Sequence, residues 1–221
     1  TLTFDHGTID HYHHAIPELD KKNLKGIFYI LTMIHEDFTL PVEDKQRKLE
    51  RIFKKKFPKI ICDELKINYN PESCKTFRNK WRFYTIEERY LRFLRDRILD
   101  LDDYKLIINK IFNKVVGTEK SFIKKNYLSW KQIKEISNKG HTIGSHSHNH
   151  VGDFKDYKHS LKILRDRLNI NVNTISYPNG KKIISNKDLK KLGIKTAYAT
   201  TFSSKKPYQL GRIDCNQFSH K

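Results

Sequence analysis

Apolar residues near the start of the chain form two short runs with a helix-like stretch between them. Residues 2–4 and 27–31 are apolar runs of strand length. Between them, residues 9–24 carry apolar side chains at helical spacing, and Gly26 stands where such a helix would end. Strand, helix and strand in this order predict a βαβ unit with two parallel strands.

The same alternation returns in the C-terminal part of the chain. Apolar periodicity there predicts helices over 130–139, 157–168 and 186–192, and strands over 141–144, 174–177, 194–200 and 209–213. Alternating strands and helices are typical of a parallel sheet, either open or closed into a barrel. We therefore expect an α/β fold.

The segment between these two parts has a different texture. It is rich in charge, and apolar residues such as Leu49, Ile52 and Phe53 recur at helical spacing. We interpret residues 41–122 as a helical insertion within a single domain of residues 1–221. A separate module is less favoured, because strands and helices alternate again after this segment.

The chain carries a large positive charge. Its 44 Lys and Arg residues against 25 Asp and Glu give a net charge of +19 over 221 residues, which favours an anionic partner such as nucleic acid, a membrane surface or an acidic glycan. The basic residues are dispersed, and the joint abundance of Lys, Ile and Asn is typical of an AT-rich coding sequence. No nucleic-acid-binding motif stands out, so nucleic acid is not expected to be the main partner.

Cysteine usage and hydropathy bear on the compartment. The three cysteines, Cys62, Cys74 and Cys215, form no CxxC pair, which argues against a disulfide framework and a cysteine-rich zinc site. Reduced thiols favour a cytoplasmic location, although a disulfide between Cys62 and Cys74 stays open. No apolar run reaches the ~20 residues of a membrane-spanning helix, and the chain begins without a signal peptide. An extracytoplasmic location would follow if an N-terminal segment has been removed.

Two polar clusters directly follow predicted strands, where parallel α/β folds place their sites. Asp5 and His6 come after the first strand, although Asp5 could instead cap the following helix. His146, His148 and His150 follow the strand over 141–144. In a helical turn, His146 and His150 share one face, and His6 could be a third ligand. In an extended segment, the three histidines of this run would alternate with Ser147 and Asn149. Three protein ligands on zinc leave a position for water, which is typical of a hydrolase. A solvated His-rich loop is the alternative.

Two further segments end predicted strands. Residues 176–180 (SYPNG) turn sharply, so their backbone N–H groups could point into a site, although a plain Pro-Asn-Gly turn explains them equally. Residues 211–214 (GRID) form a short strand with the alternating charged pair Arg212 and Asp214, which are surface residues by default.

Taken in order, these pieces resemble the NodB-homology polysaccharide deacetylase family (carbohydrate esterase family four). Residues 3–7 (TFDHG) resemble its first motif, TFDDG, and residues 129–150 resemble the helix, strand and H-S/T-x-x-H metal motif. Residues 176–180 resemble the third motif, and 9–30 the first helix and second strand. The match covers both ends of the chain, and the segment from 41 to about 122 is unmatched.

This resemblance implies a distorted (β/α) barrel that removes N-acetyl groups from amino sugars with a divalent metal. Asp5 would be the general base, His146 and His150 metal ligands, and Ser147 the hydroxyl residue between them. Tyr177 would bind the acetyl group and offer its backbone N–H to the oxyanion. The rest of that turn, Pro178, Asn179 and Gly180, would also bind substrate. Setting aside about 80 inserted residues leaves about 140, short of the ~200–250 of a complete barrel, so we expect an incomplete barrel or a missing N-terminal stretch.

The chain departs from the family pattern at several positions. His6 replaces an Asp that ligates the metal, and we therefore favour a three-histidine site. Ser176 replaces the usual Arg of the third motif, and Arg212, with Asp214 beside it, is a candidate to orient Asp5 instead. The late histidine that supplies the general acid has no clear counterpart. His148 and His220 are weak candidates for that acid, which stays unassigned.

The sequence thus predicts a metal-dependent N-deacetylase acting on an amino sugar in a glycan or glycoconjugate precursor. The metal is expected to be Zn²⁺, with Co²⁺, Mn²⁺, Ni²⁺ and Fe²⁺ as other options, and the substrate could be anionic or carrier-linked. One alternative is a deformylase or another amide hydrolase on the same scaffold, and a second is a non-catalytic glycan-binding protein. Amidohydrolase-type use of His146 and His148 is a weaker option, because such a pair normally follows the first strand.

Overall fold

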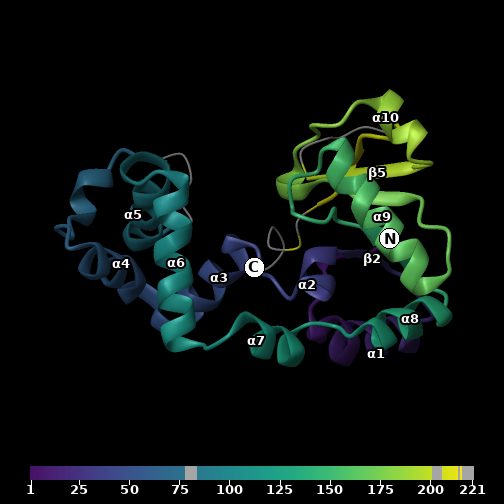
Figure 1. The fold of residues 1–221 in the computed structure, drawn as a ribbon, viewed down its shortest axis with the longest axis horizontal. Coiled ribbons are helices and arrows are strands. Elements are labelled where there is room, and N and C mark those ends of the chain that lie inside the picture. The colour runs from purple at the N-terminus through teal and green to yellow at the C-terminus, as the bar shows by residue number, and fades with distance from the viewer. Residues whose placement is uncertain (78–83, 201–205, 214, 216–221) are drawn as a thin grey trace. The chain divides into compact units, whose positions relative to one another are not determined.

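The chain divides into two compact units in the computed structural model, which describes residues 1–77, 84–200, 206–213 and 215 (Figure 1). The first unit is formed by Thr1–Thr39 and Lys120–Lys221, and the second by Leu40–Glu119. The first unit contains the sheet, and the second is built from helices and turns over the residues described. The interpretation of 41–122 as an insertion within one domain stays a prediction.

Six parallel strands form the sheet of the first unit, and each pairs with the next strand along the chain. They are β1 (Thr3–His6), β2 (Ile27–Ile30), β3 (Thr142–Ser145), β4 (Thr174–Ser176), β5 (Thr196–Ala199) and β6 (Leu210–Gly211). Because all neighbours are parallel, the carboxyl ends of the strands meet at one edge. The sheet curls into part of a barrel with helices around it, and the predicted incomplete (β/α) barrel is confirmed.

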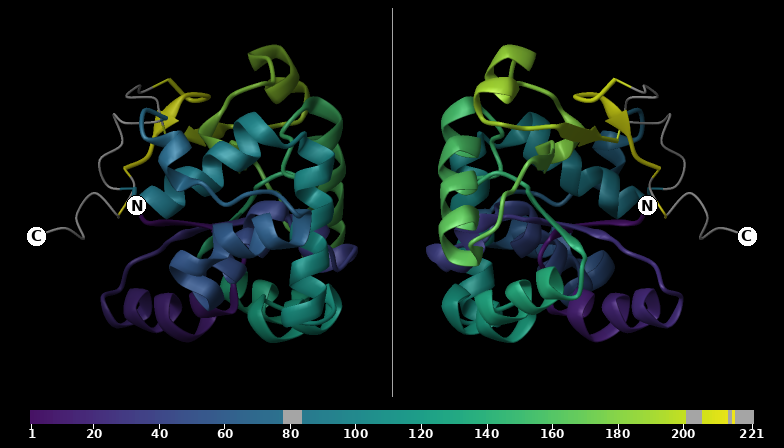
Figure 2. Two further views of the ribbon diagram at one scale, coloured as in Figure 1. Left: turned by 90° about the vertical axis from the view of Figure 1, so that its left-hand side faces the viewer. Right: turned by 90° about the vertical axis from the view of Figure 1, so that its right-hand side faces the viewer.

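The helices of the first unit lie outside the sheet, between successive strands of the chain. They are α1 (Ile16–Lys21), α2 (Thr32–Glu36), α7 (Glu119–Asn126), α8 (Trp130–Asn138), α9 (Phe154–Leu168) and α10 (Asn186–Lys191). Helices α1 and α8 lie side by side (Figures 1 and 2), joined by the bond from Lys139 to Asp20 at 2.7 Å. A capping box of Ser129 with Gln132 begins α8, and Ser185 caps α10.

The core of the first unit lies between the sheet and these helices. Buried side chains of the strands, such as Phe28, Ile143 and Ile175, pack with buried residues of α8 and α9. On β3, Gly144 is required by close packing, because a Cβ there would lie 2.4 Å from the ring of Tyr29. The Tyr29 ring therefore crosses β3, and its hydroxyl forms a hydrogen bond with Thr174 on β4.

Two predicted elements differ from the observed ones. The helix expected over 9–24 is divided into a π-helical turn (His11–Ala15) and α1, with Pro17 at the start of α1. Pro17 has no N–H to donate to the preceding turn, so the α-helical bond pattern is interrupted before α1. The strand expected over 209–213 is reduced to β6.

The second unit is helical, with α3 (Val42–Phe53), α4 (Phe57–Leu65), α5 (Ile86–Phe93) and α6 (Leu101–Val115). Its two ends are joined by Glu119, whose carboxylate accepts the N–H of Leu40 at 2.7 Å and a bond from Lys45 at 2.7 Å. The Lys45 side chain is only 5% exposed and also donates to Asn109. A buried ammonium with two oxygen acceptors is a compensated charge.

The cysteines form no disulfide among the described residues. Cys62 and Cys74 are free and buried in the second unit, and Cys215 is free and exposed. In the part of the chain that the structure describes, no helix is long and apolar enough to cross a membrane.

Candidate metal and catalytic site

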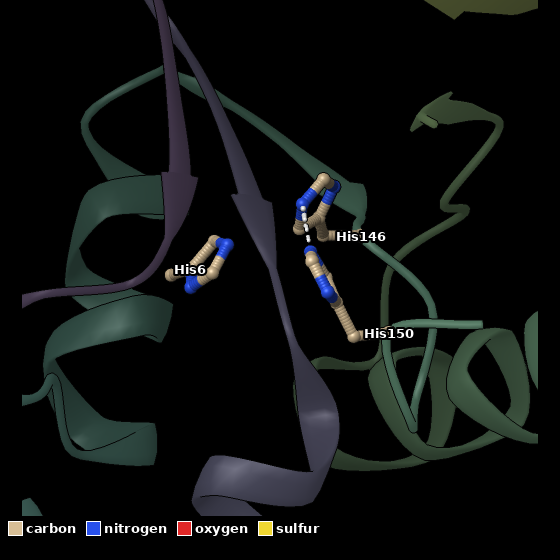
Figure 3. Close-up of side chains that lie close together, drawn as sticks. All are labelled: His6, His146 and His150. Carbon is tan, nitrogen blue, oxygen red and sulfur yellow. Dashed lines mark hydrogen bonds between the residues drawn. The ribbon is translucent and has the colours of Figure 1, made fainter. Parts of the chain in front are cut away.

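Three histidine side chains meet at the carboxyl edge of the sheet (Figure 3). His6 ends β1, His146 directly follows β3, and His150 lies four residues further along the same loop. Their candidate ligand atoms all lie within 4.8 Å of one another, and His6 and His146 are buried. The structure therefore brings together the three predicted ligands, and metal binding by them stays a prediction.

The loop that carries two of these histidines is neither helical nor extended, in contrast to both conformations considered from sequence. Residues 146–150 belong to no helix or strand. Ser147 and His150 instead have left-handed φ values of 69° and 60°. Left-handed residues reverse the chain direction within a few residues, and this reversal returns His150 to His146.

The hydrogen bonds of His146 determine its tautomer. Its Nδ1 lies 2.6 Å from the hydroxyl and 3.2 Å from the carbonyl oxygen of Ser176. A carbonyl only accepts, so we assign the proton to Nδ1, which leaves a lone pair on Nε2. Burial lowers the pKa of His146 to about 3, so the ring is neutral at neutral pH.

This lone pair faces the other ligands, and the donor set fits a metal ion. The Nε2 atoms of His146 and His150 lie 3.2 Å apart. Two imidazole nitrogens bound to one tetrahedral zinc at about 2.0–2.1 Å would lie about 3.3 Å apart. Three imidazole ligands suit zinc and its borderline neighbours, and they suit Ca²⁺ or Mg²⁺ poorly.

Asp5 lies beside this cluster and is held by Arg212. The guanidinium of Arg212 donates to Oδ1 at 2.8 Å and to Oδ2 at 2.9 Å, a bidentate arrangement that orients the carboxylate. Oδ2 lies 4.0 Å from Nε2 of His146. Burial favours the neutral acid, but the neighbouring His146 and Arg212 outweigh it and hold the pKa of Asp5 at about 2. The proposed orientation of Asp5 by Arg212 thus corresponds to a direct contact.

Ser176 connects Asp5 with His146. Its hydroxyl donates to Oδ1 of Asp5 at 3.3 Å and lies 2.6 Å from Nδ1 of His146. With the proton on Nδ1, the chain of donors runs from His146 through Ser176 to Asp5. A small hydroxyl residue at the position of the usual arginine therefore supports a metal-ligand candidate and the candidate base together.

The hydrogen bonds of Tyr177 bear on the oxyanion role expected for its backbone N–H. Its backbone N–H donates to the carbonyl of Tyr198 at 2.9 Å, and its hydroxyl donates to the carbonyl of Tyr208 at 2.9 Å. The residue is fully buried and both of its donors are already used, which argues against its backbone N–H as an oxyanion donor. The physical reason is that the parallel pairing of β4 with β5 continues one residue past β4, so the N–H of Tyr177 is used in it. Pro178, Asn179 and Gly180 follow as a short 3-10 turn.

The candidate acid His148 does not join the cluster. Its Nδ1 lies 3.0 Å from the hydroxyl of Thr32, and its Nε2 lies 3.0 Å from Asp37. Both ring nitrogens are thus paired on the side of α2, because the N–H groups of Thr32 and Met33 bind the loop carbonyls there. This arrangement argues against His148 as the acid.

The remaining predicted residues have mixed outcomes. The N–H of Ser147 donates to Ser145, and its hydroxyl is buried without a partner among the described residues. Asp214 and His220 lie outside the described residues.

Comparisons with known proteins agree with this fold. No family model matches the chain, and no curated protein matches it significantly. Among solved structures, the chain is similar to the deacetylase PplD of Streptococcus pyogenes, solved in complex with acetate, with 17% identity and a TM-score of 0.50 over 96% of this chain and 62% of that one. IcaB from Ammonifex degensii matches with 14% identity and a TM-score of 0.51, over 98% of this chain and 68% of that one.

A de-N-acetylase from Aggregatibacter actinomycetemcomitans gives 14% identity and a TM-score of 0.50, over 96% of this chain and 68% of its own. The chain spans less than two thirds of the length of the first of these structures. At such low identity the likeness concerns the fold alone, which this chain shares with these structures. The resemblance inferred from sequence is confirmed at that level.

Proposed function

We propose that this protein is a metal-dependent hydrolase that removes an N-acetyl group from an amino sugar in a glycan or glycoconjugate precursor. The observation that carries the proposal is the placement of Asp5, held by Arg212, beside the cluster of His6, His146 and His150. A carboxylate next to three convergent imidazoles is the arrangement that metal-assisted hydrolysis requires. The deacetylase fold supports the choice of an amide bond on a sugar.

His6, His146 and His150 would hold the ion, and zinc suits them best. When bound, such an ion supplies Lewis-acid chemistry, polarising the amide carbonyl and making water easier to deprotonate near neutral pH. The residues of the chain provide the rest. Asp5 is ionised at neutral pH, since its pKa is held at about 2, and it can take the proton of the attacking water.

Arg212 and Ser176 keep this carboxylate in place. Each oxygen of Asp5 accepts one bond from Arg212, and Oδ1 also accepts the hydroxyl of Ser176. Oδ2 therefore retains a lone pair on the side that faces His146, and we assign proton acceptance to this atom. The net charge of +19 would attract an anionic or carrier-linked substrate.

The test combines metal analysis with acetate release. The purified chain is loaded with Zn²⁺ or Co²⁺ and incubated with oligomers of N-acetylglucosamine, and free acetate is measured. Asp5→Asn and His146→Ala should abolish release while leaving the circular dichroism spectrum unchanged, and His13→Ala, at an exposed position, is the control.

Activity retained in both site variants would refute the assignment. Stoichiometric metal with cleavage of N-formyl but not N-acetyl sugars would favour the deformylase alternative. Absence of metal and activity, with glycan binding intact, would favour a binding protein.

A further inference from the structure

A buried carboxylate lies beneath the loop that carries His150. Asp156 stands in the first turn of α9 and is 7% exposed. Its Oδ1 accepts the backbone N–H groups of His148 at 3.0 Å and Asn149 at 2.6 Å. Its Oδ2 accepts those of Val151 at 3.0 Å and Gly152 at 2.8 Å. One side chain thus binds the loop on both sides of His150.

The backbone of this loop needs such support. Ser147 and His150 both adopt left-handed φ values, which L residues with a side chain seldom take. Conformations of this kind persist where the surrounding structure over-determines them. Four hydrogen bonds to one carboxylate provide that constraint for the half of the loop that includes His150.

Other anchors act on the first half of the loop. The N–H groups of Thr32 and Met33 donate to the carbonyls of Ser147 and His148, and the N–H of Ser147 donates to Ser145. Beyond His148, the N–H groups of the loop that donate to a side chain all donate to Asp156. The N–H of His146 itself donates to the carbonyl of Ile30 on β2, so His146 has anchors of its own. The backbone on both sides of His150 is held by Asp156.

The charge of Asp156 is compensated where it lies. Four N–H donors replace the water that burial removes from the carboxylate. The first turn of a helix also favours a negative charge, and α9 is capped separately by Asp153, which accepts the N–H of Asp156 at 2.8 Å. The carboxylate of Asp156 is thus free of the capping role and serves the loop.

We propose that Asp156 is a positioning residue that holds His150 in place for metal binding and thereby sets the affinity of the site for a divalent cation. This inference rests on the proposed function of the three histidines as ligands. Removing outer-shell support of this kind is expected to weaken metal binding by about 10- to 100-fold.

The test uses Asp156→Asn in the full chain. Asparagine has nearly the same shape, but its amide group would face two N–H donors, so one pair of loop bonds is lost. The dissociation constant for Zn²⁺, measured by competition with a chelating dye, should rise by about 10- to 100-fold. Hydrogen exchange should become faster at the amides of His148 and Asn149 or of Val151 and Gly152. The visible spectrum of the Co²⁺ form should lose tetrahedral intensity.

Asp153→Ala is the matched control, because it removes the cap of the same helix without touching the loop bonds. It should lower stability and leave the zinc affinity within about threefold of wild type. Equal zinc affinity of wild type and Asp156→Asn, or unchanged loop exchange, would overturn the role of Asp156. A wild-type chain that binds no zinc would overturn the proposed function, and the exchange data would show separately whether Asp156 holds the loop.

Discussion

Arg212 donates a hydrogen bond to each carboxylate oxygen of Asp5, at 2.8 and 2.9 Å, across 207 positions of sequence. Arg212 directly follows β6, and its own N–H is bound to Ala199 on β5. The last strand of the sheet thus supplies the partner of a residue on the first strand. This relationship explains how a chain without the usual third-motif arginine orients its candidate base.

We expect Arg212→Lys to lower kcat by about 100-fold with little change in KM, because a single ammonium cannot hold both oxygens of Asp5. Steady-state acetate release measures the effect, and the zinc affinity should stay within about threefold of wild type. A kcat equal to that of wild type would show that Asp5 does not depend on this contact.

Ser176→Ala should weaken zinc binding by about tenfold. The variant removes the hydroxyl at 2.6 Å from Nδ1 of His146 and leaves only the backbone carbonyl at 3.2 Å, so the ring is less firmly oriented. Competition with a chelator measures the change. Unaltered affinity would show that the carbonyl alone is sufficient.

His6→Ala should reduce zinc affinity by more than about 100-fold, because only two candidate ligands remain. His6→Asp should restore much of the loss, since a carboxylate also ligates zinc and is the residue of the motif that this chain resembles. Metal content after dialysis measures both, with His14→Ala, at an exposed position, as control. A chain that keeps its metal in His6→Ala would exclude His6 as a ligand.

His11 should make the protein less stable in mild acid. Burial lowers its pKa from 6.5 to about 4, with Asp5 and Asp10 opposing the shift and His6 adding to it. Above pH 6.5, His11 is neutral in both the folded and the unfolded protein. Between pH 6.5 and about 4 only the unfolded chain takes up the proton, so stability falls as pH falls.

His11→Phe should remove this effect, because the ring packs against Phe4 and Phe28. Urea unfolding should show that the substitution raises the free energy of unfolding more at pH 5 than at pH 7.5, and the difference should be on the order of 1–2 kcal/mol. His14→Phe, on the exposed side of the same turn, should show no such difference. Equal gains at both pH values would contradict the assigned pKa of His11.

Glu119→Gln should destabilise the helical unit by about 3 kcal/mol. Lys45 would keep its charge in a site where its side chain is 5% exposed, and its oxygen partners, Asn109 and the new amide oxygen, would both be neutral. Lys45→Met should cost less, because Glu119 is 26% exposed and water can solvate it. Urea unfolding of both variants gives the comparison, and the reverse order would argue against a buried charge at Lys45.

The local pattern of apolar residues in the sequence was sufficient to predict much of the fold. The alternation of short apolar runs with helical periodicity determined the βα order, because side-chain period reports which face of an element is buried. The placement of Asp5 and His6 at the end of one strand, and of His146 and His150 after another, also followed from the sequence, since parallel strands end at one edge. That edge does bring these residues together.

Only the tertiary structure decided the contacts among them. The curl and register of the sheet place Arg212 on Asp5, and continued pairing past β4 uses the N–H that Tyr177 was expected to offer. The docking of a loop on α2 pairs both nitrogens of His148, and Asp156 holds the same loop from α9. Each of these depends on distances between segments far apart in the chain, and periodicity along a single segment carries no information about such distances.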